Sequence, residues 1–530
     1  MKIGIIYFNG RTSYLTWGQM GTLISVLNNQ NCHQVKVFHI EENKVEAAVE
    51  TIKDYRPDFI LIYLKFKTYA AMQIFLENFF ECHICVCYSL PTIFPLKLLK
   101  ENYMIDSLIR GEIEDTLVEL TNRLEHKQPL YGCKGVIFRN SAGEIVDNGI
   151  RTTGVQYAAL PYAERESFPT DKRFFHILAS RGCIGSCSFC SRDTVYKFGK
   201  KSCFQLFRPI KNVVDEIDEL VKKYQCKYIG FSDSTFCGNI NGKYGIQRLR
   251  ELYNELKKRD FRIEFFLNLR SEQITANLVA MLRDLVQVGL SMVFVGFESF
   301  VPADLKVYNK IASVENNLHA AELLVHTSEL SPYYLNIEYG FINFNPYSTV
   351  SGICININTL MRLHIGLSPM DVTSIVDVRY GCRLYDKVLA DGLCTQEINL
   401  YTQSVAFKFI NKDVGLLYQR LKMAFQNYEI NIPGGFASLY NRYIFFYGTT
   451  QLSNDIRALY ISLKSKQTDY TFKLFDFIVN SLNEPEKIVE EGCQQFNSDY
   501  YHLKNIYILF ASKYCRLMAE LTRINELSYY

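Results

Sequence analysis

The most informative segment of the chain is Arg181-Gly182-Cys183-Ile184-Gly185-Ser186-Cys187-Ser188-Phe189-Cys190, which spaces three cysteines as C-x3-C-x2-C. It directly follows Phe175–Ser180, a largely apolar run typical of a β-strand. Three thiolates in one tight loop can hold three irons of a cubane and leave the fourth iron open to a ligand. The segment therefore predicts a [4Fe–4S] cluster. Its ligands would be Cys183, Cys187 and Cys190.

A zinc site is the alternative, since thiolates in a tetrahedral array suit zinc as well as iron–sulfur clusters. Cys203 lies a short way beyond the loop and is a candidate fourth ligand. No second C-x2-C pair lies nearby, however, and the loop follows a strand where a barrel carries its chemistry. An iron–sulfur cluster is therefore favoured. The zinc alternative would make the chain a zinc-stabilised binding protein without catalysis.

Strands and helices continue to alternate beyond the cysteine loop, which predicts a partial (β/α)6 barrel with its chemistry at the strand carboxyl ends. The expected strands are Phe175–Ser180, Tyr228–Ser232, Arg262–Leu269, Met292–Phe297, Tyr334–Phe344 and Thr373–Arg379. The expected helices are Asn212–Tyr224, Ile246–Arg259, Thr275–Val288 and Val314–Leu330.

The first 125 or so residues alternate in the same way, which predicts an α/β fold with a doubly wound parallel sheet. The expected strands are Lys2–Phe8, Val35–Ile40, Phe59–Leu64 and His83–Tyr88. The expected helices are Ser13–Asn28, Asn43–Asp54, Tyr69–Phe80, Leu96–Asn102 and Glu114–Glu125. Ligands of such sheets bind beyond the carboxyl ends of the strands.

These patterns divide the chain into four parts: a doubly wound domain over 1–130, a linker with a small hairpin over 131–172, a barrel over 173–399 and a helical domain over 400–530. A chain of 530 residues is too long for one core, so several domains are expected. In the last part we expect helices at Ile456–Lys464, Tyr470–Leu482 and Tyr500–Leu521.

Composition narrows the class of protein. A net charge of +3 is too small to indicate nucleic-acid or membrane binding. No apolar run reaches the roughly 18 residues of a spanning helix, and no signal peptide is recognisable. We therefore expect a cytoplasmic protein, in which the sixteen cysteines are thiols or metal ligands rather than disulfides.

The cysteine loop, with the aromatic Phe189 before its third cysteine, resembles the radical S-adenosylmethionine superfamily. The resemblance extends over roughly 175–350. It includes four further segments at expected strand ends: Gly230–Phe236, Arg270, Gly296–Ser299 and Gly340–Ile342.

The resemblance implies that S-adenosylmethionine chelates the open iron and is cleaved reductively to a 5′-deoxyadenosyl radical, which abstracts a hydrogen atom from the substrate. By the same resemblance Phe189 borders the adenine, and Arg270 suits the methionyl carboxylate because its guanidinium is a charged fork. Asp233, Gly296 and Glu298 are the other expected cofactor-binding residues. A low-potential flavodoxin or ferredoxin would supply the electron.

The first domain resembles the cobalamin-binding domain found in one group of these enzymes. Asp106–Glu114 matches that group's D-x-V-x-x-G-E-x-E segment. The D-x-H-x-x-G loop that supplies a lower cobalt ligand is absent, because Asn9 to Ser13 contain no histidine. Cys87-Tyr88-Ser89 also stands where the group has Gly-Gly, so side chains would crowd the approach to a corrin.

Two functions follow from these resemblances. The first is cobalamin-dependent radical methylation of a natural-product intermediate or a peptide. The second omits cobalamin and is an epimerisation, cyclisation or rearrangement, for which Cys382 is a candidate hydrogen donor. Cys354, Cys382 and Cys394 could instead ligate an auxiliary cluster, although their loose spacing favours structural roles.

Overall fold

The computed structural model describes the chain except for residues 10–13, 31, 79, 153–155, 169–172, 193, 199–203, 239–243, 329–334, 396–397, 426–442, 444–449, 497–500, 507 and 510–530. Cys203 and most of the helix expected at Tyr500–Leu521 therefore lie outside the described residues.

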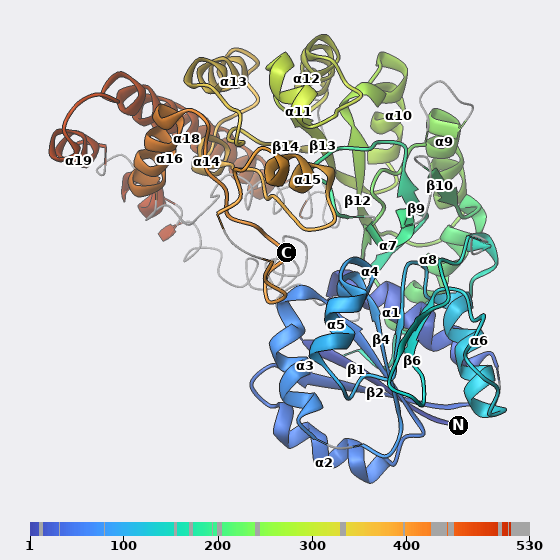
Figure 1. Cartoon of the computed structure of the whole chain (residues 1–530). Helices are drawn as coiled ribbons and strands as arrows, with labels where there is room; N and C mark the ends of the chain where they lie inside the picture. Colours follow the sequence, from blue (N-terminus) through green and yellow to red (C-terminus); the bar gives the residue numbers. More distant parts are fainter. Residues whose placement is uncertain are drawn as a thin grey trace.

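The first sheet, at the bottom of Figure 1, has five parallel strands that are extended by an antiparallel hairpin. Its order is β2 (Gln34–Glu41), β1 (Lys2–Asn9), β3 (Phe59–Leu64), β4 (His83–Tyr88), β5 (Ser107–Ile109), β6 (Val136–Arg139) and β7 (Ile145–Asp147). Every residue of β3 is buried, as its uninterrupted apolar sequence requires of a strand covered on both faces. The hairpin expected in the linker thus completes the sheet.

Helices cover both faces of this sheet. They are α1 (Tyr14–Asn28), α2 (Val45–Tyr55), α3 (Tyr69–Leu76), α4 (Ser89–Ile93), α5 (Pro95–Glu101) and α6 (Glu114–Glu125). Side chains alternate along each strand, so two separate apolar clusters form, one on each face. Helices α1 and α6 pack together, as do α2 and α3.

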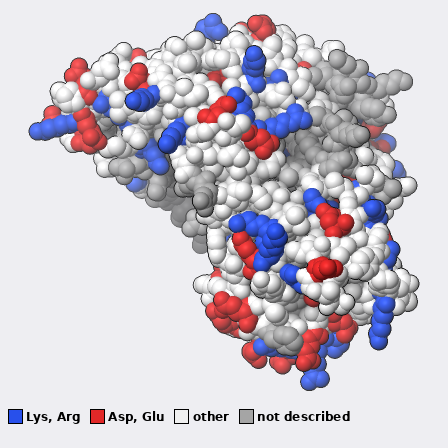
Figure 2. Space-filling view, viewed as in Figure 1, with Lys and Arg blue, Asp and Glu red and all other residues white. Residues whose placement is uncertain are grey.

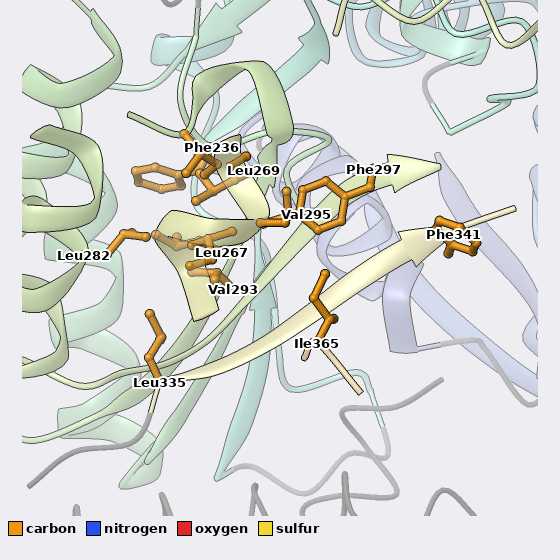
Figure 3. Packing of buried hydrophobic residues seen from close by; sticks show 14 of the residues in the cluster. Phe236, Leu267, Leu269, Leu282, Val293, Val295, Phe297, Leu335, Phe341 and Ile365 are labelled. Atoms are coloured by element: carbon orange, nitrogen blue, oxygen red, sulfur yellow. The ribbon is translucent and has the colours of Figure 1, made fainter. Parts of the chain in front are cut away.

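The second sheet has five parallel strands, in the order β14 (Asn336–Phe341), β13 (Leu290–Glu298), β12 (Glu264–Arg270), β11 (Tyr228–Phe231) and β8 (Phe174–Ile177). Its helices are α8 (Ile210–Tyr224), α9 (Tyr244–Lys257), α10 (Ala276–Val286), α11 (Pro302–Val307), α12 (Val314–Ser328) and α13 (Val350–Arg362). Figure 3 shows how Leu267, Val293 and Leu282 fill the space between strands and helix. The predicted α/β class, with a parallel sheet followed by a partial barrel, is confirmed.

The sixth barrel strand, expected over Thr373–Arg379, is reduced to two isolated bridges, Phe344 with Ile375 and Arg379 with Ser404. Pro369 begins the short helix α14 (Pro369–Thr373), and Ser368 and Asp371 cap each other there. A proline at the first helical position and a capping box both favour a helix. The first residue of the expected strand, Thr373, is therefore the last residue of a helix.

The C-terminal part is helical, as predicted. Helices α16 (Lys412–Phe425) and α18 (Gln451–Asn480) pack on α13 and α14 at the β14 side of the barrel, followed by α19 (Glu486–Gln494) (Figure 1). The two helices expected at Ile456–Lys464 and Tyr470–Leu482 are one continuous helix, α18. The segment between them, 465–469, contains no glycine or proline to end a helix.

In the parts of the chain that can be described, no helix combines the length and the apolarity that crossing a membrane demands. Figure 2 shows basic and acidic side chains interspersed over the visible face, in keeping with the small net charge of +3.

Candidate active site

The cysteine loop begins in a short antiparallel pair formed by β9 (Ser180–Cys183) and β10 (Phe204–Phe207). Gly182 has a φ of +85°, which a residue with a side chain rarely adopts. The backbone N–H of Gly185 donates to Cys183 Sγ at 3.3 Å. Cys183 is buried, Cys187 is half-buried and Cys190 is exposed. The three thiols thus run from the interior to the surface along one loop.

The spacing of these thiols discriminates between one metal ion and a cluster. Tetrahedral zinc with bonds of 2.3 Å places its sulfur ligands about 3.8 Å apart. Among the described residues, only Cys32, His33 and Glu125 form a trio of ligand atoms that all lie within 4.8 Å of one another. The loop cysteines are more widely spaced.

Arg270, at the end of β12, lies against two of the thiols. Its Nη1 is 3.8 Å from Cys183 Sγ and 3.7 Å from Cys187 Sγ, and its Nε donates to Glu272. Burial would lower the pKa of the guanidinium, but Glu272 and the two thiols outweigh burial and raise it. A Cβ on Gly185 would lie 2.1 Å from Arg270 Nη1. Glycine at position 185 therefore lets the guanidinium reach the thiols.

The turn after α11 and the start of α15 (Arg383–Ala390) hold the loop in place. Ser188 N–H donates to Tyr308 O at 2.8 Å, and Ser188 O accepts from Leu384 N–H at 2.8 Å. The ring of Phe189, expected to border adenine, packs edge-on against Tyr308 at 5.4 Å. These contacts fix the loop between two elements that are distant in sequence.

Asp233 is completely buried at the end of β11. Its carboxylate accepts from Ala179 N–H at 3.0 Å and from the hydroxyl of Ser180. Burial raises the pKa of Asp233, and these two hydrogen bonds oppose the rise. The structure therefore places Asp233 where it shapes the entry into the cysteine loop.

Glu298 ends β13 with a φ of +67°, next to a register shift between Gly296 and Glu298. A bulge at a strand end re-aims side chains and is common beside active sites. Glu298 Oε1 lies 3.4 Å from the ammonium of Lys310, which also donates to Gly296 O at 3.1 Å. Burial raises the pKa of Glu298, and Lys310 opposes the rise. Lys310 was missed by the sequence analysis, because it follows α11 and no strand-end pattern marks it.

Glycine at two positions makes room for the Glu298 carboxylate. A Cβ on Gly296 would lie 2.5 Å from its Oε1, and one on Gly340 would lie 3.2 Å from its Oε2. The structure therefore brings Gly296 and Glu298 together with Arg270 at the carboxyl edge of the barrel strands, since β12 and β13 are neighbours.

Cys382 lies beneath the cysteine loop, where its thiol donates to Phe189 O at 3.3 Å. The residue is 2% exposed, and burial raises its pKa to about 12, with Cys190 adding to the shift. Cys354 and Cys394 do not approach it: Cys354 lies on α13 near Asp476, and Cys394 bridges to Phe407. These three cysteines therefore do not gather into a ligand set.

The carboxyl edge of the first sheet is joined to the cysteine loop. Glu114, at the start of α6, forms a buried ion pair with Arg181, and the Arg181 guanidinium lies 4.6 Å from the ring centre of Tyr157. Gly111 has a φ of +78°, and a Cβ there would lie 3.3 Å from Phe198, just after the loop. The segment Asp106–Glu114 therefore contacts the chain on both sides of the cysteine loop, at Arg181 and at Phe198.

The same edge of the first sheet carries a lysine that the sequence analysis did not single out. Lys65 directly follows β3, and its Nζ lies 3.1 Å from the hydroxyl of Tyr7 on β1. Burial and the nearby Lys67 lower the pKa of Lys65 to about 8. Tyr88, at the position of the missing Gly-Gly, has a φ of +91° and stacks on Tyr63 with ring centres 4.2 Å apart.

Comparison with known proteins identifies a family model and a relative that resemble this chain. Residues 177–327 match the model of the radical SAM superfamily. Over 395 residues the chain is 25% identical to 4′-phospho-dehydrooxetanocin synthase of Priestia megaterium, covering 70% of this chain and 51% of that protein. The chain thus spans about half the length of this curated relative.

Two solved structures share the fold. The cobalamin-dependent S-adenosylmethionine radical enzyme OxsB, with aqua-cobalamin and S-adenosylmethionine bound, aligns with a TM-score of 0.71 and 16% identity over 99% of this chain and 80% of that chain. The radical S-adenosylmethionine methyltransferase TsrM of Kitasatospora setae, with cobalamin and a [4Fe–4S] cluster bound, aligns with a TM-score of 0.56 and 14% identity over 74% and 76%. The chain therefore shares its fold with these two structures.

Proposed function

We propose that this chain, which carries a radical S-adenosylmethionine domain, reductively cleaves S-adenosylmethionine and uses the resulting 5′-deoxyadenosyl radical to functionalise an unactivated carbon. The observation that carries the proposal is the C-x3-C-x2-C loop of Cys183, Cys187 and Cys190, two of whose thiols lie against the guanidinium of Arg270. When bound, a [4Fe–4S] cluster supplies the electron for this cleavage.

The residues around the loop have separate tasks in this proposal. Arg270 holds a permanent positive charge beside the thiols, which suits the methionyl carboxylate. Glu298 and Lys310 present a buried acid and base at the next strand end, where they can hydrogen-bond the polar groups of the bound molecule. Phe189 and Tyr308 keep the loop apolar on one side and exclude water. Asp233, the remaining expected cofactor-binding residue, holds the entry into the loop through Ala179 and Ser180.

We propose further that cobalamin binds at the carboxyl edge of the first sheet, where it would supply a methyl group to the substrate radical. The edge faces the cysteine loop through Gly111 and Glu114, and it offers the amine of Lys65. The reaction is then radical methylation of a natural-product intermediate or a peptide.

The stack of Tyr63 and Tyr88 supports a second candidate, because it fills the strand end where a corrinoid nucleotide needs space. In that case the first sheet is a scaffold and the reaction is a cobalamin-independent epimerisation, cyclisation or rearrangement. Cys382 would donate the hydrogen atom in an epimerisation, which would require its buried thiol to reach the substrate.

We propose that the protein acts in the reducing cytoplasm and receives electrons from a low-potential flavodoxin or ferredoxin. The electron would enter from the outer side of the cysteine loop, where Cys190 is exposed.

The test is cofactor content after anaerobic purification and iron–sulfur reconstitution, with and without hydroxocobalamin. We expect broad iron–sulfur absorbance, retained cobalamin after desalting, and reductant-dependent formation of 5′-deoxyadenosine. Cluster and cleavage without retained cobalamin would favour the second candidate. Zinc in place of iron, with no cleavage, would contradict both candidates.

Replacing Arg270 by methionine should lower kcat/KM for S-adenosylmethionine cleavage by about 100-fold or more while iron content stays high. The variant keeps the apolar stem but loses a charge-assisted hydrogen bond, for which losses of about 10²–10³ are typical. Arg270→Lys should recover only part of the rate, because it lacks the planar fork. Arg283→Met, on the exposed face of α10, is the matched control and should cleave at the normal rate. Equal rates in the Arg270 and Arg283 variants would refute the assignment.

A further inference from the structure

We propose that Cys32, His33 and Glu125 bind one zinc ion at the edge of the first sheet opposite the cysteine loop. The ion would be a structural centre, separate from the radical chemistry. Cys32 and His33 directly precede β2, and Glu125 is the last residue of α6. They lie where the amino ends of β1 and β2 pair, beside the N label of Figure 1 and away from the barrel.

The distances between the ligand atoms are the first argument. Cys32 Sγ lies 3.6 Å from each ring nitrogen of His33, and His33 Nδ1 lies 3.8 Å from Glu125 Oε2. Atoms bound to tetrahedral zinc at about 2.0–2.3 Å lie about 3.3–3.8 Å apart, and thiolate, imidazole and carboxylate are all zinc ligands. Cys32 is exposed, so its side chain can make the short turn that brings sulfur and imidazole around one ion.

The environment of His33 is the second argument. Its side chain is 0% exposed. Its contacts with the thiol and the carboxylate, at 3.6 and 3.8 Å, are too long for strong hydrogen bonds, whereas they suit two ligands of one ion. Burial lowers the pKa of His33 more than Glu125 raises it, so the ring is neutral at pH 7 and keeps a lone pair for a metal.

The charges around the three residues favour a cation. Glu125 lies in the last turn of α6, at the negative end of the helix dipole. This corner already holds one positive charge, because the amino group of Met1 lies 3.2 Å from Glu125 Oε1 and donates to Cys32 O at 3.3 Å. That contact engages Oε1, whereas Oε2 faces His33.

Binding is an acid–base step without electron transfer. Burial and the Glu125 carboxylate raise the pKa of the Cys32 thiol, so the thiol starts protonated. Its proton leaves to solvent as the sulfur bonds to zinc, and the imidazole and the carboxylate each supply one lone pair. A water molecule completes the tetrahedron. The ion would join the start of β2 to the end of α6, the helix whose first residue, Glu114, pairs with Arg181.

The test is the zinc bound by the full-length, cluster-loaded protein after anaerobic equilibration with excess zinc and desalting. Loading the cluster first occupies the thiols of the cysteine loop. We expect one zinc per chain in addition to iron, and zinc X-ray absorption with one sulfur at about 2.3 Å and lighter ligands at about 2.0 Å. Absence of zinc overturns the assignment. Zinc with no sulfur or with several also overturns it, because the ion is then bound nonspecifically or in the cysteine loop.

Variants with matched controls give an independent check. Cys32→Ser and His33→Gln should each lower the zinc affinity by more than the roughly 10–100-fold that follows loss of an outer-sphere partner. Cys493→Ser and His319→Gln change the same residue types elsewhere and should bind zinc normally. Zinc should also raise the unfolding temperature of the wild type but not of the two site variants.

Normal zinc affinity in both site variants overturns the assignment. The X-ray absorption of the wild type decides the question even if a variant does not fold. A protein that binds zinc through one sulfur but forms no 5′-deoxyadenosine supports this assignment and contradicts the proposed function alone.

Discussion

The simultaneous replacements Cys183→Ala, Cys187→Ala and Cys190→Ala should yield a colourless protein that binds almost no iron and forms no detectable 5′-deoxyadenosine. Arg270 lies against the thiols of two loop cysteines, Cys183 and Cys187. A thiolate is the protein ligand of an iron–sulfur cluster, and alanine cannot replace it. Iron content, the visible spectrum and the cleavage assay measure the effect.

A second triple variant controls for the general loss of cysteines. Cys32→Ala, Cys82→Ala and Cys493→Ala remove the same number of thiols from exposed or half-buried positions outside the loop. This variant should keep its iron and its cleavage rate. Iron retained in the loop variant would show that the ligands lie elsewhere, and iron lost from both variants would show that the loss reflects folding rather than ligation.

The cysteine loop was predictable because its information is local. Three ligands within eight residues need no knowledge of the fold, and the strand before them is an apolar run. The same holds for β3, whose bounds at Phe59–Leu64 match the sequence prediction because a strand buried on both faces is apolar throughout. Two predictions failed in detail: α18 continues through a polar stretch, and the helix that begins at Pro369 includes Thr373, the first residue of an expected strand.

Other parts of the site depend on long-range contacts that no short pattern encodes. Lys310 reaches Glu298 from the turn after α11, and Lys65 meets Tyr7 across 58 positions of sequence. A signal was available for Lys65: a charged residue directly after a strand as apolar as Phe59–Leu64 lies at the ligand-binding edge of a parallel sheet. Glu114 could also be recognised in the sequence, as the last acid of Asp106–Glu114. Its ion-pair partner, Arg181, could not.

The buried ion pair of Glu114 and Arg181 gives the second prediction with a large expected effect, which is on folding stability. Glu114→Gln should destabilise the folded protein by about 3–5 kcal/mol, because it removes the buried carboxylate that pairs with the Arg181 guanidinium. Glu114 is 4% exposed and Arg181 is 2% exposed, so water cannot compensate. Tyr157 covers one face of the guanidinium and limits its escape. Anaerobic thermal and urea unfolding, followed with separate probes because two sheets are joined here, measure the loss.

A double-mutant cycle separates the ion pair from the packing around it. Arg181→Met alone leaves Glu114 buried and unpaired, so it should cost as much as Glu114→Gln. The double variant Glu114→Leu, Arg181→Met leaves no buried charge and should lose less than either single variant, since apolar replacements of a buried pair are often close to neutral. Losses that simply add would mean that the two residues act independently.

The surface pair of Arg110 and Asp147 is the matched control, because it also joins distant segments but lies partly in solvent. Asp147→Asn should cost less than about 1 kcal/mol.

The Glu114–Arg181 ion pair has a further consequence for the cluster, because Arg181 is two residues before Cys183. If Glu114 holds the start of the loop, Glu114→Gln should also slow iron–sulfur reconstitution, whereas Asp147→Asn should leave it unchanged. Reconstitution at the normal rate in a destabilised Glu114→Gln variant would show that the ion pair joins the two sheets without shaping the loop.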